Sequence, residues 1–371
     1  MSEENSQRPP EAERPYVGGQ AVIEGVMMRS PHAMAIAVRR SDGSIVLRQD
    51  AWDPVLAKLK FLRWPFLRGS LVLIESMWNG VQALHFSAEQ ADAEVPKPSA
   101  GRVVRSVLLA PAIAATGPAP MAAKGGAALA ASIVLSLVFA FGLFKGLPHF
   151  LTWGAGKLFG IELGVSDPAF HVVDGTFKLG IFIGYVVMIG RLEEIRRVFQ
   201  YHGAEHKSIN AYEHNESLTV ANARKHTTFH ARCGTSFVLF VILLSVVIFA
   251  VAFPFVPKLS ENALLNQLGM LFIKIPLMFP VAGLAYEINR FASRHPGSVL
   301  VSWMVSPGRM MQKLTTREPT DDQLEIALAA MRAALDQEAK MSGPSAPRHS
   351  DHSIVVFNGF REVEAALPEA A

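Results

Sequence analysis

Residues 236–256 read SFVLFVILLSVVIFAVAFPFV, an apolar run that decides the fold class. A helix needs about 20 apolar residues to cross the hydrocarbon core of a bilayer, and this run has that length without a charged residue. Three further segments reach a similar length, at 127–147, 171–190 and 268–288. We therefore predict a mainly α-helical, polytopic membrane protein with four spans, and the lipid bilayer is its first expected partner.

The composition agrees with a membrane location. The chain is 50% hydrophobic without counting Gly and has a mean hydropathy of +0.26, whereas typical soluble domains reach roughly 45–50% only when Gly is included. A net charge of +3 indicates no general affinity for nucleic acid, so no nucleic-acid partner is expected. The single cysteine excludes an internal disulfide and fits a reducing compartment. Residues 1–15 lack the apolar core of a secretory signal.

The connections between the spans differ in charge. Lys and Arg are frequent in 191–234 and after the fourth span, but 148–169 holds only Lys157 and 257–267 only Lys258. Positively charged connections stay on the cytoplasmic side of a membrane. We therefore expect a multi-pass protein of the plasma membrane (the inner membrane of a two-membrane cell), with both termini and the 191–234 segment in the cytoplasm.

The regions outside the spans also carry local signals. Residues 33–38 and 44–49 predict a β-hairpin, because Asp42 and Gly43 between them supply the positive φ of the turn. The Gly-rich stretch 18–31 predicts a tight turn entering a strand, or else Glu24 and the glycines line a site. Residues 66–86 predict a helix that lies at the interface, packs under the bundle or re-enters the membrane. SIVVF at 353–357 predicts one more strand, and Thr320 to Gln323 resembles a capping box.

These signals divide the chain into eight regions. They are a disordered tail at 1–15, the hairpin with an amphipathic helix at 16–90, a linker at 91–126, the first two spans at 127–190, a His-rich cytoplasmic helical segment at 191–234, the last two spans at 235–290, a cytoplasmic helical segment at 291–340, and a mostly disordered tail at 341–371.

The strongest chemical signal lies in the 191–234 segment. His202, Glu205 and His206 form H-x-x-E-H, the inverted zinc-peptidase motif. Both histidines continue an apolar stripe that steps by three and four residues from Leu192, so they are expected on the buried face of a helix. Gly203 costs roughly 1 kcal/mol in a helix interior relative to Ala, which indicates a close approach of another group there.

A second set of ligands follows. His226, His230 and Cys233 would share one face of a second helix, within about 60° of arc at 3.6 residues per turn. Histidine and cysteine are zinc ligands, and three protein ligands leave one position for water. Glu205 would then act as general base, with Glu24, Glu213 and Glu216 as further candidates for base or ligand.

Structural interpretations compete with this one. Five of the twelve histidines fall within 202–230, but paired histidines on a buried helix face can also be core residues bonded to carbonyls. Cys233 precedes Gly234 at the entry to a span, and there a buried, inert thiol is as plausible as a ligand.

Five motifs give the chain a resemblance to a known family. They are GGQAVIEGVMMRSP at 18–31, RWPFLRGSLVLIESMWNGVQAL at 63–84, YHGAEHKSINAYE at 201–213, HTTFHARCGTSF at 226–237 and LTTREPTDDQLEIALAAM at 314–331. On these motifs the chain resembles the YqhQ-like family of bacterial membrane proteins, described as predicted metal-dependent enzymes. The resemblance implies functional roles for Gly18, Gly19, Glu24 and Arg29 in the first motif and for His202, Glu205, His206, His226, His230 and Cys233 in the later ones.

The preferred hypothesis is a divalent-metal enzyme, most simply a zinc hydrolase, at the boundary between membrane and cytoplasm. His202 and His206 would bind the metal, helped by His226, His230 or Cys233, with Glu205 and Glu24 as catalytic carboxylates. Gly18, Gly19 and Arg29 would line the site. A lipid-linked or membrane-peptide substrate and a homo-oligomeric state are further expectations. A non-catalytic scaffold or metal-binding regulatory protein is the alternative, and a small-solute transporter is third.

Overall fold

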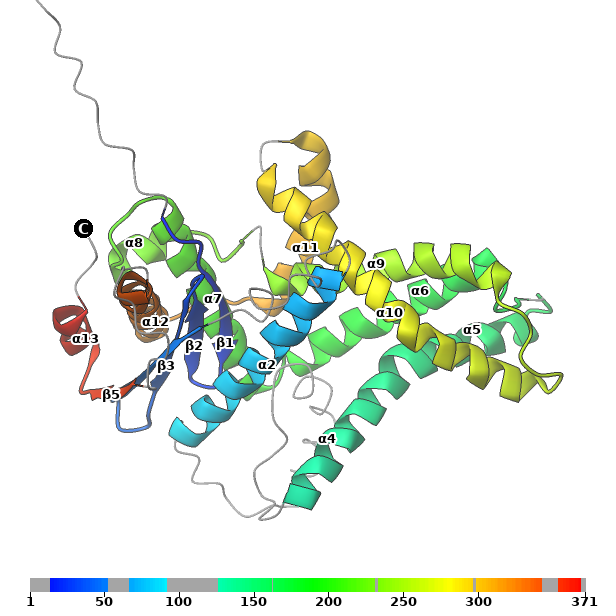
Figure 1. Cartoon of the computed structure of the whole chain (residues 1–371), viewed down its shortest axis with the longest axis horizontal. Coiled ribbons are helices and arrows are strands. Elements are labelled where there is room, and N and C mark those ends of the chain that lie inside the picture. The colour runs from blue at the N-terminus through cyan, green and yellow to red at the C-terminus, as the bar shows by residue number, and fades with distance from the viewer. Residues whose placement is uncertain are drawn as a thin grey trace, which may run out of the picture.

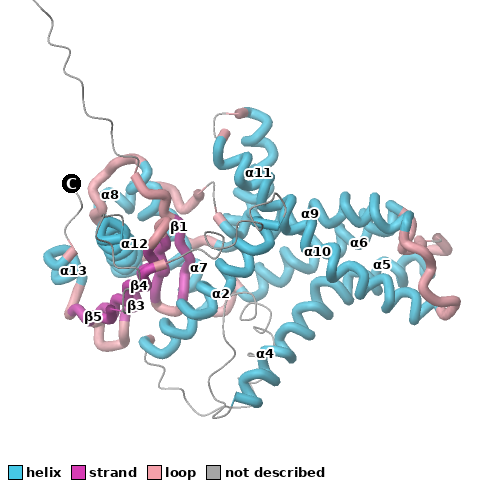
Figure 2. The backbone as a smooth tube through the Cα atoms, in the orientation of Figure 1, coloured by secondary structure: helices cyan, strands magenta, loops and turns pink. Residues whose placement is uncertain are grey.

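The computed structural model describes residues 14–52, 67–91, 126–161, 163–230, 233–295, 298–341 and 353–367. A five-stranded sheet with helices on both faces lies next to a bundle of long apolar helices (Figures 1 and 2). Residues 92–125 of the expected linker, nearly all of the first tail, and residues 342–352 and 368–371 of the last tail fall outside the described residues.

The sheet is an antiparallel meander of neighbouring strands. Its order is β1 (Gly18–Val22), β2 (Gly25–Arg29), β3 (Ala33–Arg39), β4 (Ile45–Ala51) and β5 (Ser353–Phe357). The predicted hairpin is confirmed as β3 and β4, with Gly43 at a φ of 87° in the turn. The Gly-rich stretch is itself a hairpin, and SIVVF adds the last strand beside β4.

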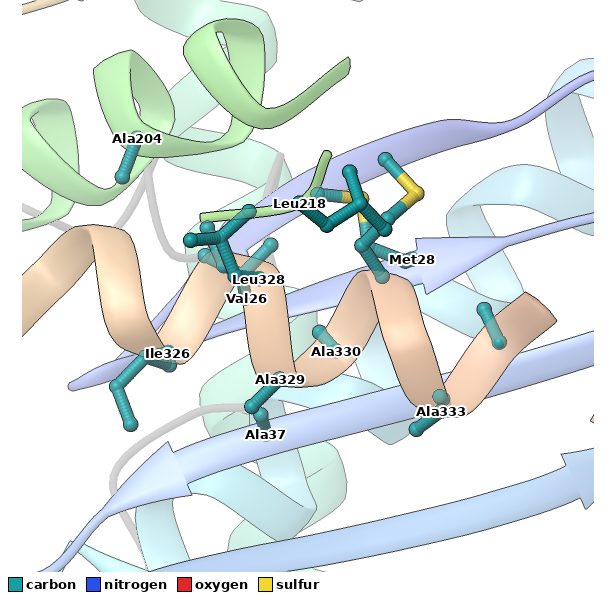
Figure 3. Close-up of a cluster of buried hydrophobic side chains, with 14 of the residues drawn as sticks. Val26, Met28, Ala37, Ala204, Leu218, Ile326, Leu328, Ala329, Ala330 and Ala333 are labelled. Atoms are coloured by element: carbon teal, nitrogen blue, oxygen red, sulfur yellow. The ribbon is translucent and has the colours of Figure 1, made fainter. Parts of the chain in front are cut away.

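Alternating side chains give the sheet two apolar faces. One face, with Val26, Met28 and Ala37, packs on α12 (Asp321–Met341) and α7 (Glu193–Glu213). Small alanines of α12 let that helix approach the strands closely (Figure 3). On the opposite face, residues such as Met27 and Ile36 pack on α2 (Leu67–Gln90). The period of two that defines a strand therefore places a helix on each side.

Four apolar helices of the bundle are long enough to cross a membrane. The spans are Val134–Phe159, Pro168–Ile189, Phe237–Phe255 and Ala263–Ala292, which indicates a membrane protein. The helices are α4 (Gly126–Phe141) continuing through η2 (Gly142–Gly146) into α5 (Leu147–Leu158), α6 (Pro168–Ile189), α9 (Gly234–Ala252) with η3 (Phe253–Phe255), and α10 (Ala263–Arg294). The first span lies further along the chain than 127–147, because η2 joins α4 to α5 without a break.

The remaining helices of the described chain are α8 (Val220–Lys225), α11 (Val299–Thr315) and α13 (Phe360–Ala366). Helices α8 and α13 pack on α12, and α11 packs on α9. The predicted helix at 66–86 is α2, which packs against α10 as well as the sheet. The predicted cap of α12 forms in part, because the Gln323 Oε1 accepts a hydrogen bond from the Thr320 backbone N–H at 2.9 Å.

One prediction is wrong. His226, His230 and Cys233 do not share a helical face, because α8 ends at Lys225 and the described residues that follow are extended or turning until α9 begins at Gly234. The backbone carbonyls of 227, 228 and 229 accept hydrogen bonds from side chains of α7. They are therefore held by tertiary partners in place of a helical ladder.

The turn between β1 and β2 offers a test of the sheet. A methyl group on Gly25 would overlap the backbone carbonyl oxygen of Ala37, so we expect Gly25→Ala to lower the free energy of unfolding by roughly 1–3 kcal/mol, as overpacking does. The measurement is the fraction of full-length protein that stays folded in detergent as temperature rises. Gly154→Ala is the control, since nothing lies within 4 Å of its added Cβ. Equal midpoints for the two variants would contradict the packing described.

Candidate functional site

Helix α7 carries the H-x-x-E-H motif as a buried helix face. Glu205 is 5% exposed and His206 is 1% exposed, because α7 lies between β1, α12 and the 226–233 segment. The group that approaches Gly203 closely is the backbone near the start of the 314–331 motif. A methyl group there would overlap the Arg317 carbonyl oxygen, and the Arg317 N–H donates to the Phe199 carbonyl at 2.9 Å.

Side chains of α7 hold the extended segment in place. The amide of Asn210 donates to the carbonyls of Thr227 and Phe229 at 3.0 and 3.1 Å. His206 Nδ1 lies 2.6 Å from the carbonyl oxygen of Thr228. Buried carbonyls need hydrogen-bond partners, so these bonds fix the course of the chain that leads to Cys233.

His202, His206 and Cys233 converge at the start of α9. One ligand atom from each lies within 4.8 Å of the others, and His202 Nε2 is 3.2 Å from Cys233 Sγ. The two imidazole centroids are 4.4 Å apart. Cys233 is 5% exposed and is the residue that precedes the first turn of α9. The site therefore joins α7 of the sheet unit to an apolar helix of the bundle.

The hydrogen bonds of the two histidines define their tautomers. His202 Nδ1 lies 2.9 Å from the Thr315 carbonyl, and His206 Nδ1 lies 2.6 Å from that of Thr228. A carbonyl only accepts, so we assign a proton to Nδ1 in both rings, and a metal ion at Nε2 would take the place of any proton there. Metal-binding histidines are commonly oriented in this way by a second partner.

The charges of the site favour a thiolate. Burial acts to raise the pKa of Cys233, but the charge and hydrogen bond of His202, together with His206, hold it well below its usual range. Burial acts to lower the pKa of His202, but Cys233 and Glu205 outweigh it and raise that pKa to about 9. A thiolate is the form of cysteine that binds a metal.

Glu205 lies beside this group without a hydrogen bond to any described residue. A methyl group on Gly19 would sit 2.7 Å from Glu205 Cγ, so the absence of a side chain in β1 makes room for the carboxyl group. Burial raises the pKa of Glu205, against the opposing charges of His206 and His202. Burial therefore makes this carboxyl group hold a proton more tightly than an exposed glutamate does.

His230 and His226 take different places. The His230 ring centroid is 5.7 Å from that of His206, and its Nε2 is 3.3 Å from both carboxylate oxygens of Glu213. Burial lowers the pKa of His230. His226 Nε2 lies 3.0 Å from Glu216, and its ring is 4.9 Å from that of His214. His230 therefore flanks the converging group, while His226 belongs to a separate surface cluster.

The remaining sequence candidates are not brought to this group. Glu24 has a φ of 50° in the β1–β2 turn and pairs with Arg197 of α7, with a Tyr201 hydroxyl 3.3 Å away. The Arg29 guanidinium lies 5.4 Å from the Trp52 ring centroid. The nearest neighbour of an added Gly18 Cβ is Tyr16 at 3.8 Å. Among the first-motif residues, Gly19 alone is placed against a side chain of the site.

Sequence reasoning missed the partners that orient the site. The backbone of Thr315 and the side chain of Gln312 carry no ligand signature, yet Gln312 clamps the His230 backbone in both directions, at 3.0 and 2.8 Å. Carbonyl partners depend on backbone course, which residue identity does not reveal. One signal in the sequence was available: the last motif begins at Leu314, next to the residue whose carbonyl orients His202.

The chain belongs to the family described as Protein of unknown function (DUF1385), whose model matches residues 64–337. It is also 32% identical over 346 residues to "Uncharacterized protein YqhQ" of Bacillus subtilis (strain 168), a match that covers 91% of this chain and 97% of that protein. No solved structure matches the chain. The resemblance to a YqhQ-like family is thereby confirmed. Neither printed description names an activity.

The clamp on the extended segment can be tested at Asn210. In Asn210→Asp the side chain keeps its shape but loses both donors, so two buried carbonyls lose their partner, at roughly 1–3 kcal/mol for each unsatisfied group. We expect faster tryptic cleavage at Arg224 and Lys225. The readout is the half-life of intact chain in detergent, with fragments identified by mass. Asn266→Asp is the control, since that side chain accepts from the Leu259 N–H through an oxygen that aspartate keeps, away from the cleavage sites. Unchanged cleavage in Asn210→Asp would refute the clamp.

Proposed function

We propose that the protein is a membrane-bound metalloprotein in which His202, His206 and Cys233 hold a divalent ion, with zinc the first choice. The observation that carries this proposal is the shared orientation of the two histidines, whose Nδ1 atoms face backbone carbonyls while the ligand atoms converge within 4.8 Å of Cys233. Tetrahedral zinc with bonds of 2.0–2.3 Å needs ligand atoms about 3.3–3.8 Å apart. Shifts of about 1 Å in the side chains would meet that requirement.

Within this proposal, an enzyme is the first reading. Two histidines and one cysteine are a ligand set of catalytic zinc sites, which keep a fourth position for water and lower the pKa of that water to about 7. Glu205 is the neighbouring carboxyl group and would accept the proton. Such a site suits a hydrolase. Because the ligands meet where the sheet unit joins the apolar helices, a lipid-linked or membrane-peptide substrate is the class we propose.

The burial of the ligands favours a second candidate. His206 and Cys233 are 1% and 5% exposed, and the surface hollows beside α13 and at the α5–α6 turn are not lined by either residue. A closed metal site with Glu205 as fourth ligand would tie α7 to the start of α9. The protein would then act as a scaffold, or as a regulator that responds to metal; we call this closed, non-catalytic metal site the joint.

We also propose an orientation. The sheet unit and the His-rich segment lie at one end of the bundle, and the two short connections 159–167 and 256–262 lie at the other (Figure 2). The sheet end carries most of the Lys and Arg of the connections, so we place it in the cytoplasm and the short connections outside, in the plasma membrane.

Metal content tests the proposal directly. Full-length protein purified without chelators should carry about one zinc per chain, the content of a mononuclear site, and His206→Ala and Cys233→Ser should lose it. His226→Ala should keep it, because that ring pairs with Glu216 away from the site. The measurement is elemental analysis of protein that elutes as a single folded species. A metal-free wild type that also fails to bind added zinc would end the proposal.

Whether the metal has an open coordination position distinguishes the enzyme hypothesis from the joint hypothesis. In cobalt-substituted protein, added azide should change the visible spectrum if water occupies the fourth position, and Glu205→Gln should keep the metal and that response. If Glu205 is itself the fourth ligand, azide leaves the wild-type spectrum unchanged, and Glu205→Gln weakens metal binding. Glu213→Gln serves as the matched control, since that carboxylate faces His230 and lies outside the three converging ligands. The first result supports the enzyme and the second supports the joint.

A further inference from the structure

A second polar centre lies inside the apolar bundle, remote from the histidine–cysteine site. Asp174 and Lys178 of α6 and Lys274 of α10 are 1%, 3% and 1% exposed. Asp174 lies about 9 Å along the helix axis from Pro168 and Lys178 about 15 Å, at 1.5 Å per residue. Both therefore sit within a candidate span. Ionisable groups at such depth are costly and usually functional.

The side chains form a continuous chain of hydrogen bonds. Lys178 Nζ and Lys274 Nζ donate to the same oxygen of Asp174, at 3.2 and 3.0 Å. Lys274 Nζ also lies 3.1 Å from His149 Nδ1, and His149 Nε2 lies 2.9 Å from the side-chain oxygen of Gln267. An ammonium only donates and a carbonyl only accepts, so His149 accepts at Nδ1 and donates at Nε2. The donors therefore point in one direction, from Lys274 to Gln267.

The chain of hydrogen bonds ends at a surface hollow. Gln267 lines the hollow beside the α5–α6 turn, together with Trp153, Lys157 and Leu163. His149 is fully buried one step inside. Water in the hollow is thus separated from Lys274 by one imidazole and one amide.

The cluster holds more cations than anions. Lys145, Lys178 and Lys274 all place Nζ within 6 Å of the Phe249 ring centroid, at 5.4, 5.9 and 5.7 Å. Asp174 is the one carboxylate that the described residues bring to them, and Lys145 bonds to the sulfur of Met278. Three ammonium groups against one carboxylate would leave two uncompensated charges in an apolar interior, which is strongly unfavourable. Loss of one proton reduces that excess from two positive charges to one.

Two buried atoms of the cluster are hydrogen-bond acceptors without a partner, which favours uptake of a proton. The second oxygen of Asp174 and Nδ1 of His171 have no hydrogen-bond partner, while His171 Nε2 donates to the Val165 carbonyl. Both unpaired atoms accept protons. The side chains are packed against one another, and a proton moves along such a chain without a cavity. The titratable groups that face the cluster are His149 of α5, Lys145 of η2, His171, Asp174 and Lys178 of α6, and Lys274 of α10, while α9 contributes Phe249.

From this arrangement we propose that Lys274, Asp174 and His149 form a proton-binding relay inside the bundle, in exchange with water in the hollow beside Gln267. On release, the Lys274 Nζ–H bond breaks and the proton joins His149 Nδ1, while the Nε2 proton of His149 passes to water as Gln267 moves aside. Lys274 is left as a neutral amine and one hydronium ion leaves. Uptake reverses these steps. The proposal of this relay does not rest on the proposed metal site.

A difference titration of full-length protein in detergent tests the relay. Lys274→Arg keeps a cation at the same position but cannot lose its proton. Between about pH 6 and pH 9, where an exposed lysine stays charged, the wild type should bind one more proton per chain on acidification than Lys274→Arg. Lys258→Arg, on the exposed α9–α10 connection, is the matched control and should titrate like the wild type. Identical curves for Lys274→Arg and the wild type would overturn the relay and favour a permanently charged lysine with a bound anion.

The route to the hollow has its own readout. His149→Gln keeps a hydrogen-bonding side chain but cannot pass a proton between two nitrogens, so proton uptake after a rapid pH jump should slow at least tenfold. His85→Gln, on the exposed surface of α2, should leave the rate unchanged. An unchanged rate in folded His149→Gln would show that protons arrive by another route and would refute this path.

Discussion

Burial of the polar face of α7 is the constraint on which the site depends. A helix that buries His206, Lys207 and Asn210 needs a partner for each of these polar groups, because an unpaired buried group costs roughly 1–3 kcal/mol. The partners are backbone carbonyls at 224, 227, 228 and 229, and the His202 ring takes the carbonyl at 315. The same bonds that satisfy α7 thus determine where the chain enters α9 and where α11 ends.

That constraint also explains the orientation of the two imidazoles. Once each Nδ1 is bonded to a carbonyl, Nε2 of His202 faces Cys233, whose thiol sits before the first turn of α9. The positive end of that helix and the His202 charge both favour a thiolate. Once His202 loses its Nε2 proton, two oriented imidazoles and an anionic sulfur in a buried site attract a cation, which is the physical basis of the metal proposal.

Sequence patterns predicted the elements that depend on local interactions. The span at 236–256, the helix with the H-x-x-E-H face and the hairpin turn at Gly43 follow from hydropathy, a 3.6-residue stripe and a positive φ. The helix predicted from the ligand spacing at 226–233 is wrong. Donors of Asn210 and His206 bind backbone carbonyls of this segment, so those carbonyls do not form helical hydrogen bonds. The pairing of β5 with β4 joins residues about 300 positions apart, and no local pattern encodes that contact.

The two buried polar centres differ in their charge balance, and this difference bears on their proposed functions. At the junction of sheet and bundle, the positive charge of His202 lies beside the negative charge of Cys233, so these two charges balance each other. A metal ion bound there would replace the protons of the site. Inside the bundle, three lysines face one aspartate and two acceptor atoms stay unpaired. Such an imbalance is costly in a low-dielectric interior, and release of a proton lowers that cost. Because α9 begins at Cys233 and carries Phe249 among the three lysines, one rigid helix connects both centres. A change in proton occupancy that shifts α9 would therefore also move the sulfur ligand of the proposed metal site.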